Sequence, residues 1–515
     1  MRVASEDHSR RCLTVGLGNP EARLLGEAAR RLTILWVIQQ VNARAHCLEN
    51  RTWAAEYRHS MTTQATVDVP GLLDEQKVSS FQIRVLVLCA LAVMLDGFDT
   101  QAIGYVAPAV ARDLHLGHRA LSSVFASGLI GVMIGALTFG PIADRFGRRL
   151  IIIFCTTFFG LVSLATAMAD SASSLMILRF IGGLGLGGVM PNAIALTSEF
   201  CPRRSRGTMV MVMFCGFPIG ATIGGFAAAP IIPAFGWRGV FILGGILPLV
   251  LAPVLFVMLP ESVRHLVLRG NNGARVAKLV TRLNPQLVLG SDTAFVIREE
   301  CEPGMAIAHL FRQRRALPTV LLWIVFFASL LDLFMLSNWL PTVFHDAGIS
   351  LSFSVMATAL FQAGGVLGSL ALGGMVDRFG AYRVLSLIYL FGAIFVASLG
   401  PSRSIIAIMG CTFCAGIGII GGQTGANVLA ASIYPTFIRA TGVGWALGIG
   451  RIGSIVGPIL GGVMLSLHWP LTAIFLAAAI PAVCGSAAIY LMSRTQGAAD
   501  LGKQIGSLSA GVAPE

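Results

Sequence analysis

Apolar stretches of about 20 residues alternate with short polar connections along most of the chain, beginning at Ile83. A helix of this length crosses the hydrocarbon core of a bilayer, because each residue adds about 1.5 Å and the core is about 30 Å thick. A polar connection at 260–316 divides the stretches into two groups of six. The pattern predicts twelve membrane-spanning helices, at residues 83–106, 120–142, 150–169, 174–198, 208–232, 238–259, 317–340, 353–375, 382–400, 404–431, 441–465 and 470–492.

The composition is that of a membrane protein. Of the 515 residues, 55% are hydrophobic and only 12% are charged, whereas soluble proteins carry about 25% charged residues. The 59 glycines fit transmembrane helices that pack closely through small residues. We therefore expect an all-α membrane protein with twelve transmembrane helices.

The net charge of +12 could indicate binding to nucleic acid, but the positions of the basic residues argue against it. Most of them lie in short loops beside apolar stretches, where Lys and Arg mark the cytoplasmic side of a membrane. The even-numbered connections and both termini are therefore predicted to be cytoplasmic, with no nucleic-acid partner. The basic residues are Arg145, Arg148 and Arg149 in the second connection, Arg203, Arg204 and Arg206 in the fourth, and Arg264, Arg269, Arg275, Lys278, Arg282, Arg312, Arg314 and Arg315 in the central one.

Residues 1–60 differ from the rest of the chain. They are Arg-rich, and their one apolar run, "LTILWVIQQV", is too short to span a bilayer. Met61 then opens the polar stretch "MTTQATVDVPGLLDEQK". We predict a cytoplasmic segment at 1–82, of which 1–60 is a disordered extension or a start-site error, and a cytoplasmic tail at 493–515.

The two groups of helices resemble each other at a constant offset. "GPIADRFGRR" returns 233 residues later as "GGMVDRFGAY". By the same offset Asp99 corresponds to Asp332, whereas the counterpart of Asp96 is Ser329. Two six-helix halves related by an axis along the membrane normal are typical of one class of secondary transporter. The predicted parts are a first bundle at 83–259, a cytoplasmic central loop at 260–316 and a second bundle at 317–492.

Several stretches resemble one transporter family. "GPIADRFGRR" resembles the cytoplasmic signature G-x-L-a-D-r-x-G-r-[kr]-x of the major facilitator superfamily. "DGFDTQAIGYVAP", "RFIGGLGLGGVMPNAIALTSEF", "LPESVRHL" and "YPTFIRATGVGWALGIGRIGSIVGP" extend the resemblance to its aromatic acid:proton symporter family. The resemblance runs from about residue 75 to 495 and does not include residues 1–60.

The resemblance implies a transporter of the bacterial inner membrane that imports an aromatic acid anion, such as a hydroxybenzoate, together with protons by alternating access. It also implies a monomer that is not an enzyme. Two other interpretations stay open: a proton-driven exporter of organic compounds, and a membrane sensor of aromatic acids that transports nothing. The family's functional residues match Asp96, Asp99, Asp144, Arg179, Glu199, Arg439 and Arg451 here.

Asp96 and Asp99 are the candidate proton carriers. At positions i and i+3 they lie on neighbouring parts of one helix face, about 4.5 Å apart along the axis. Two like charges this close in a low dielectric do not both ionise easily, so one of them is expected to bind and release a proton. The alternative is a pair of structural aspartates at a helix kink near Gly97. Asp332 joins them as a hypothesis because it is the repeat counterpart of Asp99.

Arg179 and Arg451 are the candidate partners of a substrate carboxylate. Both fall in or near apolar spans, where an unpaired cation is costly, and Arg offers a carboxylate two parallel hydrogen bonds. A structural ion pair with Asp96, Asp99 or Glu199 is the competing interpretation.

Four further residues are candidates for binding a hydroxylated ring by hydrogen bonds or stacking. Such residues serve more commonly as hydrogen-bonding contacts between helices or as an interfacial aromatic belt. They are Asn338, Trp339, Gln423 and Asn427.

The loop signature is the candidate for conformational control. Gly140 and Gly147 permit a tight turn and a close helix approach. Asp144 can pair with loop arginines or with a helix N-terminus in one conformation and release them in another. The alternative is an ordinary positive-inside loop with one acid. The predicted gating residues are Gly140, Asp144, Arg145, Gly147, Arg148, Glu199, Asp377 and Arg439.

No motif supports an enzyme or a metal site. "GGLGLGG" at 182–188 resembles a dinucleotide fingerprint, but it lies within a membrane span with no strand before it, which favours close helix packing. Cys411 and Cys414 form a C-x-x-C without the second pair of a zinc site. We expect no metal, no cofactor and no catalytic residue.

Overall fold

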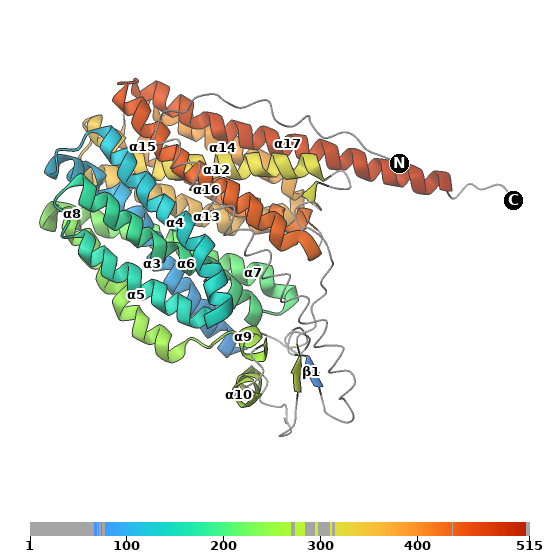
Figure 1. The fold of residues 1–515 in the computed structure, drawn as a ribbon. Coiled ribbons are helices and arrows are strands. Elements are labelled where there is room, and N and C mark those ends of the chain that lie inside the picture. The colour runs from blue at the N-terminus through green and yellow to red at the C-terminus, as the bar shows by residue number, and fades with distance from the viewer. Residues whose placement is uncertain are drawn as a thin grey trace, which may run out of the picture. The chain divides into compact units, whose positions relative to one another are not determined.

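The computed structural model describes residues 66–68, 71, 74, 78–268, 273–283, 294–296, 310–311, 315–402, 404–434 and 436–510. The predictions made for residues 1–60 lie outside these residues. The described chain is almost entirely helical, as the sequence predicts (Figure 1). It also contains one unpredicted pair of short parallel strands, β1 (Thr66–Asp68) and β2 (Ala294–Val296).

The helices follow one another along the chain. They are α3 (Ser80–Asp113), α4 (His118–Phe146), α5 (Arg148–Thr166), α6 (Ala172–Phe200), α7 (Arg203–Phe214), α8 (Gly216–Met258), α9 (Val263–Leu268), α10 (Gly273–Leu283), α12 (Ala316–Asp346), α13 (Leu351–Phe379), α14 (Ala381–Leu399), α15 (Ile405–Ile433), α16 (Thr436–Ser466) and α17 (Leu471–Ala510).

Local sequence explains where several of these helices begin and end. Ser79 and Ser171 are extended residues whose side chains accept hydrogen bonds from the first turns of α3 and α6, as N-cap residues do. Gly147 and Gly380 separate α4 from α5 and α13 from α14, with φ of 103° and 85°. Only glycine adopts these angles without strain, so these two positions fix the turns of the repeated signature.

Eleven helical stretches of the described chain are long and apolar enough to cross a membrane, one fewer than predicted. The difference lies in Arg204–Met258, a 55-residue stretch counted once. Gly236 interrupts it with a φ of 72°. Before that glycine, the chain runs in the same direction as α3, and after it the chain runs antiparallel to α5. The contacts that define these directions join Gly216 to Ala90, Gly224 to Phe98, Phe241 to Ser163 and Phe256 to Arg149.

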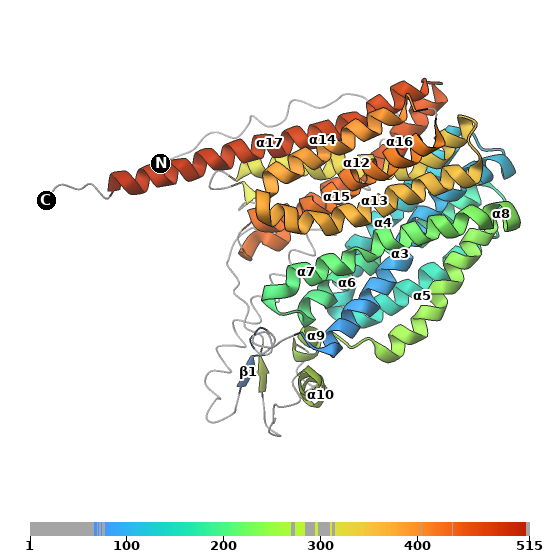
Figure 2. The same cartoon turned by 180° about the vertical axis from the view of Figure 1, so that it is seen from behind.

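The stretch thus consists of two segments, so the described part of the chain has twelve apolar helical segments, in agreement with the number predicted from the sequence. The first six-helix half consists of α3 to α8 and the second of α12 to α17. Helix α3 packs closely on α8 and α4 on α6, while α12 packs on α16 and α13 on α15. The same pairing in both halves is the structural form of the 233-residue repeat. The second half, yellow to red, lies above the first half, blue to green, in both views (Figures 1 and 2).

Corresponding glycines make the same close contact in each half. A Cβ atom on Gly220 would overlap the carbonyl oxygen of Met94, and one on Gly453 would overlap that of Phe327. Both pairs are related by the repeat offset. These positions need glycine because the helix backbones approach too closely for any side chain.

The two halves share a core at one end of the bundle only. One buried cluster takes residues from both halves, from Phe98 to Leu129 and from Leu330 to Phe361 among others. Two further clusters each take residues from one half only, together with residues of the central connection. We call the end with the shared core the Asp113 end, because it holds the α3–α4 connection, and the opposite end the Asp144 end.

Hydrogen bonds between the halves reinforce the Asp113 end. Arg112 Nη2 lies 2.8 Å from His345 Nε2, and His118 Nε2 lies 3.1 Å from Asp346 Oδ2. The separate cores at the Asp144 end show that the halves are packed independently there. The structure therefore holds the Asp113 end together.

Candidate functional site

A narrow cavity lies between the two halves near the middle of the bundle. It has room for about one water molecule in this conformation. Most of its wall is apolar, with one guanidinium, one hydroxyl and one amide. The lining residues are Thr100 and Ile103 of α3, Val124, Phe125, Gly128, Leu129 and Val132 of α4, Arg179 and Leu186 of α6, and Asn338 of α12.

Arg179 forms a buried ion pair with Asp99. Arg179 Nη1 lies 3.1 Å from Asp99 Oδ2, and Arg179 Nη2 donates to the Asp99 carbonyl oxygen at 3.1 Å. Ser163 donates to the other carboxylate oxygen at 2.8 Å, and the guanidinium lies 5.5 Å from the centre of the Phe241 ring. Every oxygen of this carboxylate has a partner, which is what a buried charge requires. The pair ties α3 to α5, α6 and α8.

One donor of Arg179 stays unused. Its Nε atom is buried and makes no hydrogen bond to the described residues. A Cβ built on Gly128 would lie 3.9 Å from this Nε, and both residues line the cavity. Arg179 is therefore both half of an ion pair and the cavity's cation.

Asp96 turns toward different partners. Its Oδ1 accepts a hydrogen bond from Thr100 Oγ1 at 3.1 Å, and its charge interacts with Arg451 of α16 in the other half. The two aspartates of "DGFD" thus have different partners. Asp99 is tied within the first half, while Asp96 is linked electrostatically to the second.

Asp332 occupies the place of Asp99 in the second half but has different neighbours. The repeat counterparts of Ser163, Arg179 and Phe241 are Val396, Thr412 and Ile474, so no cation stands where Arg179 would be. The Asp332 side chain is fully buried beside the Ala482 backbone and Tyr389, and neither carboxylate oxygen makes a hydrogen bond of ordinary geometry to the described residues.

Tyr389 completes this buried group. Its hydroxyl donates to Ser329 Oγ at 3.0 Å, and Ser329 is the counterpart of Asp96. The second half thus has a polar cluster of Ser329, Asp332 and Tyr389 at the position where the first half has Asp96 and Asp99. Asp332 does not line the cavity described above.

The four predicted ring-binding residues separate into two groups. Asn338 lines the cavity and donates from Nδ2 to the Phe334 carbonyl oxygen of its own helix at 2.7 Å. Trp339 donates to the Pro458 carbonyl oxygen at 2.8 Å and packs edge-on against Phe125, so it supports the cavity wall from behind.

Gln423 and Asn427 lie on α15 and do not line this cavity. Gln423 Oε1 and Asn427 Oδ1 are buried without a hydrogen-bond partner among the described residues. The structure therefore brings Asn338 to Arg179, but not the two amides of α15.

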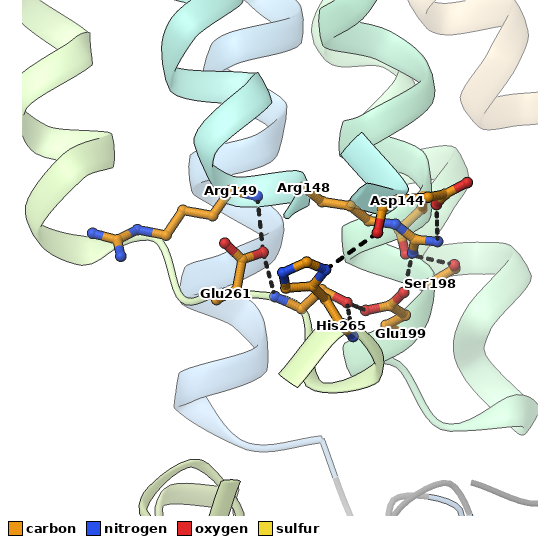
Figure 3. A network of polar contacts seen from close by, with 9 residues as sticks. Asp144, Arg148, Arg149, Ser198, Glu199, Glu261 and His265 are labelled. Atoms are coloured by element: carbon orange, nitrogen blue, oxygen red, sulfur yellow. Dashed lines mark hydrogen bonds and ion pairs between the residues drawn. The ribbon is translucent and has the colours of Figure 1, made fainter. Parts of the chain in front are cut away.

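A polar network at the Asp144 end joins the loop signature to the end of α6 (Figure 3). Arg148 pairs with Glu199, and its Nη2 lies 3.8 Å from Asp144 Oδ1. Ser262 donates its hydroxyl hydrogen to Glu199 Oε2, and His265 Nδ1 lies 3.3 Å from the Asp144 carbonyl oxygen. The predicted residues Asp144, Arg148 and Glu199 are thus neighbours in space.

Glu261 covers the turn at Gly147 and was not singled out from the sequence. Its Oε1 accepts hydrogen bonds from the backbone N–H groups of Arg149 at 3.2 Å and Ser262 at 2.9 Å. A Cβ on Gly147 would overlap the Glu261 carboxylate. Glycine is needed here mainly for its φ angle, and a Cβ would in addition displace the flexible end of the Glu261 side chain.

The other predicted gating residues lie outside the network contacts described above. A Cβ on Gly140 would meet no atom within 4 Å, so the close helix approach expected there is wrong for this conformation. Arg145 lies 5.6 Å from the Phe146 ring centre. The side chains of Asp377 and Arg439 lie outside the described part of the structure, and so do any contacts they make.

Metal binding finds no support in the described residues, since no three His, Cys, Asp or Glu side chains are grouped there as ligands. The polar groups instead suit an organic anion. The cavity offers a guanidinium N–H, a hydroxyl and an amide inside an apolar wall with one aromatic ring.

Comparisons with known proteins agree with this architecture. The family model of the Major Facilitator Superfamily matches residues 89–399 and again 322–509, so the second match begins 233 residues after the first. The chain is 40% identical over 434 residues to the 4-hydroxybenzoate transporter PcaK of Pseudomonas aeruginosa, covering 84% of this chain and 97% of that protein. It is 39% identical over 431 residues to the gallate transporter of Pseudomonas putida, covering 82% and 95%.

Among solved structures, the fold resembles a bacterial homologue of the human lysosomal transporter Spinster in an inward-facing, unoccupied conformation. The TM-score is 0.61 at 17% identity, over 81% of this chain and 98% of that one.

Proposed function

This chain belongs to the major facilitator superfamily of membrane transporters, and from that premise we propose that it imports an aromatic carboxylate together with protons. The relatives named for 4-hydroxybenzoate and gallate transport support a hydroxybenzoate-type substrate. The observation that carries the proposal is the cavity between the halves, which Arg179 lines together with Phe125 and in which Arg179 Nε has no hydrogen-bond partner among the described residues.

Substrate recognition follows from this geometry. A carboxylate oxygen accepts from Arg179 Nε, and a charge-assisted bond of this kind is strong in a site that excludes water. The aromatic ring lies against the apolar wall and Phe125, while Asn338 offers an amide to a ring hydroxyl. The cavity is too narrow for a ring in this conformation, so substrate entry requires the halves to move apart.

Proton coupling is assigned to Asp96. Its charge faces Arg451 across the interface, so protonating Asp96 removes an attraction between the halves. Asp99 is held by Arg179 and Ser163 and serves to orient Arg179. Asp332 is a second candidate proton site, because it is a buried acid with no cation at the position equivalent to Arg179.

The halves share a core at the Asp113 end and pack separately at the Asp144 end, which supports an inward-facing state. By the positive-inside rule the Asp144 end, with Arg145, Arg148 and Arg149, is cytoplasmic, as are the two termini and the loop at 260–316. The shared core then closes the opposite side. The Asp144, Arg148 and Glu199 network stabilises the first half in this state and rearranges in the other.

We place the protein in a bacterial inner membrane as a monomer. A proton-driven exporter with the same fold is distinguished from an importer by direction alone. A sensor that transports nothing is distinguished by the absence of any flux.

Uptake into proteoliposomes tests the proposal. Purified full-length protein is reconstituted, and entry of labelled 4-hydroxybenzoate is measured with a proton gradient directed inward. We expect accumulation above the outside concentration and its collapse when an uncoupler is added. Arg179→Gln should abolish it, whereas Arg238→Gln, an exposed arginine at the Asp113 end, should not. Accumulation only under the opposite gradient would establish export, and binding without flux would establish a sensor.

A further inference from the structure

Thr100 connects Asp96 to the cavity, because it contacts both. Its Oγ1 donates to Asp96 Oδ1 at 3.1 Å, and the same residue lines the cavity with Arg179 and Asn338. Asp96 does not line the cavity itself. A substrate in the cavity therefore meets Thr100 directly and Asp96 only through it.

This use of a threonine hydroxyl is unusual for the protein. Threonines within membrane helices commonly donate to the carbonyl oxygen four residues earlier in the same helix. Several threonines here do so, at 2.6–3.2 Å: Thr138, Thr157, Thr166, Thr222, Thr358, Thr412 and Thr424. Thr100 donates instead to a side-chain carboxylate four residues earlier, which leaves its hydrogen free to move when that carboxylate changes charge.

We propose that Thr100 is the positioning residue that couples proton binding at Asp96 to substrate binding in the cavity. While Asp96 is ionised, the single hydroxyl hydrogen of Thr100 is directed to Asp96 and none is left for the substrate. When Asp96 takes a proton from water, the new acid O–H donates to Thr100 Oγ1. The hydroxyl hydrogen then turns to the substrate carboxylate.

The chemistry of a hydroxyl allows this reversal. It has one hydrogen to donate and two lone pairs that accept, so the Asp96–Thr100 bond is kept while its direction changes. The substrate carboxylate gains a second donor beside Arg179 Nε only when Asp96 is protonated. One hydrogen bond to a charged group changes affinity by about ten- to one-hundred-fold. By linkage, substrate binding favours protonation of Asp96 by the same factor.

The other acids do not have this connection. Both Asp99 side-chain oxygens are occupied by Arg179 and Ser163, and Asp332 is away from the cavity lining. The charged and titratable groups that act on Asp96 are Arg451 of α16, Asp99 of its own helix and Cys155 of α5. Thr100 donates a hydrogen bond to Asp96 and lines the cavity, whereas Arg451, Asp99 and Cys155 do not line it.

Equilibrium binding tests the relay, which rests on the proposed function. Labelled 4-hydroxybenzoate is titrated onto the purified full chain in lipid nanodiscs at about pH 6 and about pH 8, where a benzoate-type carboxyl stays ionised. The variants are Thr100→Val, which removes the hydroxyl and keeps the shape, Thr100→Ser, which keeps the hydroxyl, and Asp96→Asn, which mimics the protonated acid.

The wild type should bind about tenfold or more tightly at the lower pH. Thr100→Val should bind equally at both values, at the weak level of the wild type at pH 8, and Thr100→Ser should keep the wild-type ratio. Asp96→Asn should also be independent of pH, but at the tight level. A Thr100→Val protein with the full wild-type ratio, or a Thr100→Ser protein that loses it, overturns the relay alone. A wild type that binds no aromatic carboxylate at either pH overturns the proposed function and the relay with it.

Discussion

Arg112 and His345 meet across the interface between the halves, with 2.8 Å between Arg112 Nη2 and His345 Nε2. The two residues are 233 positions apart, so equivalent positions of the repeat face each other at the Asp113 end. A guanidinium only donates, so His345 Nε2 must accept. His345 Nδ1 then carries the hydrogen and donates to the Ile349 carbonyl oxygen at 3.2 Å. The contact requires a neutral imidazole.

This contact predicts that Arg112→Gln loosens the Asp113 end. Exposed polar contacts contribute about 0–1 kcal/mol, so the outward-open population should rise only a few-fold. Spin labels at the exposed positions Ser123 and Ala347 would report the change by pulsed electron–electron distance measurements. Arg238→Gln is the matched control, because Arg238 pairs with Asp113 inside the first half. An equal rise of the outward-open population in both variants would show that the Arg112–His345 contact does not specifically hold this end closed.

The Asp99–Arg179 pair predicts opposite effects of single and double substitution. Arg179→Gln leaves a carboxylate buried without its cation, which should cost about 3–5 kcal/mol of stability. Adding Asp99→Asn removes the remaining charge and should restore most of that loss. Uptake should stay absent in both proteins, since the cavity has lost its cation. Thermal unfolding in detergent and proteoliposome uptake measure the two properties separately. Recovery of uptake in the double variant would show that Arg179 serves only to neutralise Asp99.

Gly128 predicts a loss of uptake without a loss of fold. An alanine Cβ there would lie 3.6–3.9 Å from Arg179 atoms, which is ordinary contact, but it would take up space in the cavity beside Arg179 Nε. Uptake by Gly128→Ala should fall about tenfold or more, since a displaced carboxylate loses its charge-assisted bond. Gly410→Ala is the control, because a Cβ there meets nothing within 4 Å. Normal uptake by Gly128→Ala would place the carboxylate elsewhere.

Comparing alanine substitutions at Gly147 and Gly380 measures how much the contact with Glu261 contributes to the stability of the turn at Gly147. Both glycines have positive φ, so Gly147→Ala and Gly380→Ala should each cost about 1–3 kcal/mol of backbone strain. A Cβ at Gly147 would overlap the Glu261 carboxylate, whereas a Cβ at Gly380 would meet no atom within 4 Å. The Gly147 substitution should therefore lower stability more. The difference in thermal stability between the two variants measures this contact. It should disappear when Glu261→Ala is added to Gly147→Ala, and a persisting difference would point to another cause.

Asp332→Asn tests whether the second half carries a proton. The substitution keeps the shape of a buried side chain that has no ion pair among the described residues, so stability should change by less than in Arg179→Gln. If Asp332 binds a transported proton, uptake should fall and its pH dependence should flatten. Unchanged uptake at every pH would remove Asp332 from the proton pathway.

The helices and the repeat were predictable because both are local properties of the chain. Length and apolarity decide whether a segment crosses a bilayer, so the sequence predicts separate spans at 208–232 and 238–259. The structure places the reversal between them, at Gly236. Conserved spacing between "GPIADRFGRR" and "GGMVDRFGAY" likewise requires no knowledge of contacts.

The candidate site was predictable only in part. Spacing placed Asp96 and Asp99 on adjacent parts of one helix, but it did not show that they have different partners. Glu261 and Ser262 lie in the stretch "LPESVRHL", which points to the family and says nothing about Gly147 or Glu199. Thr100 carried no signal beyond its position four residues after Asp96.

The sequence by itself determined the crossings, the two halves and the set of intramembrane charges, because the energetics of burial in lipid act on each segment separately. Only the tertiary structure decided which charges pair: Arg179 with Asp99, Arg451 facing Asp96, and no cation for Asp332 at the equivalent position. Those pairings join residues from different helices, and electrostatic energy in a low dielectric depends on distances that no local pattern contains.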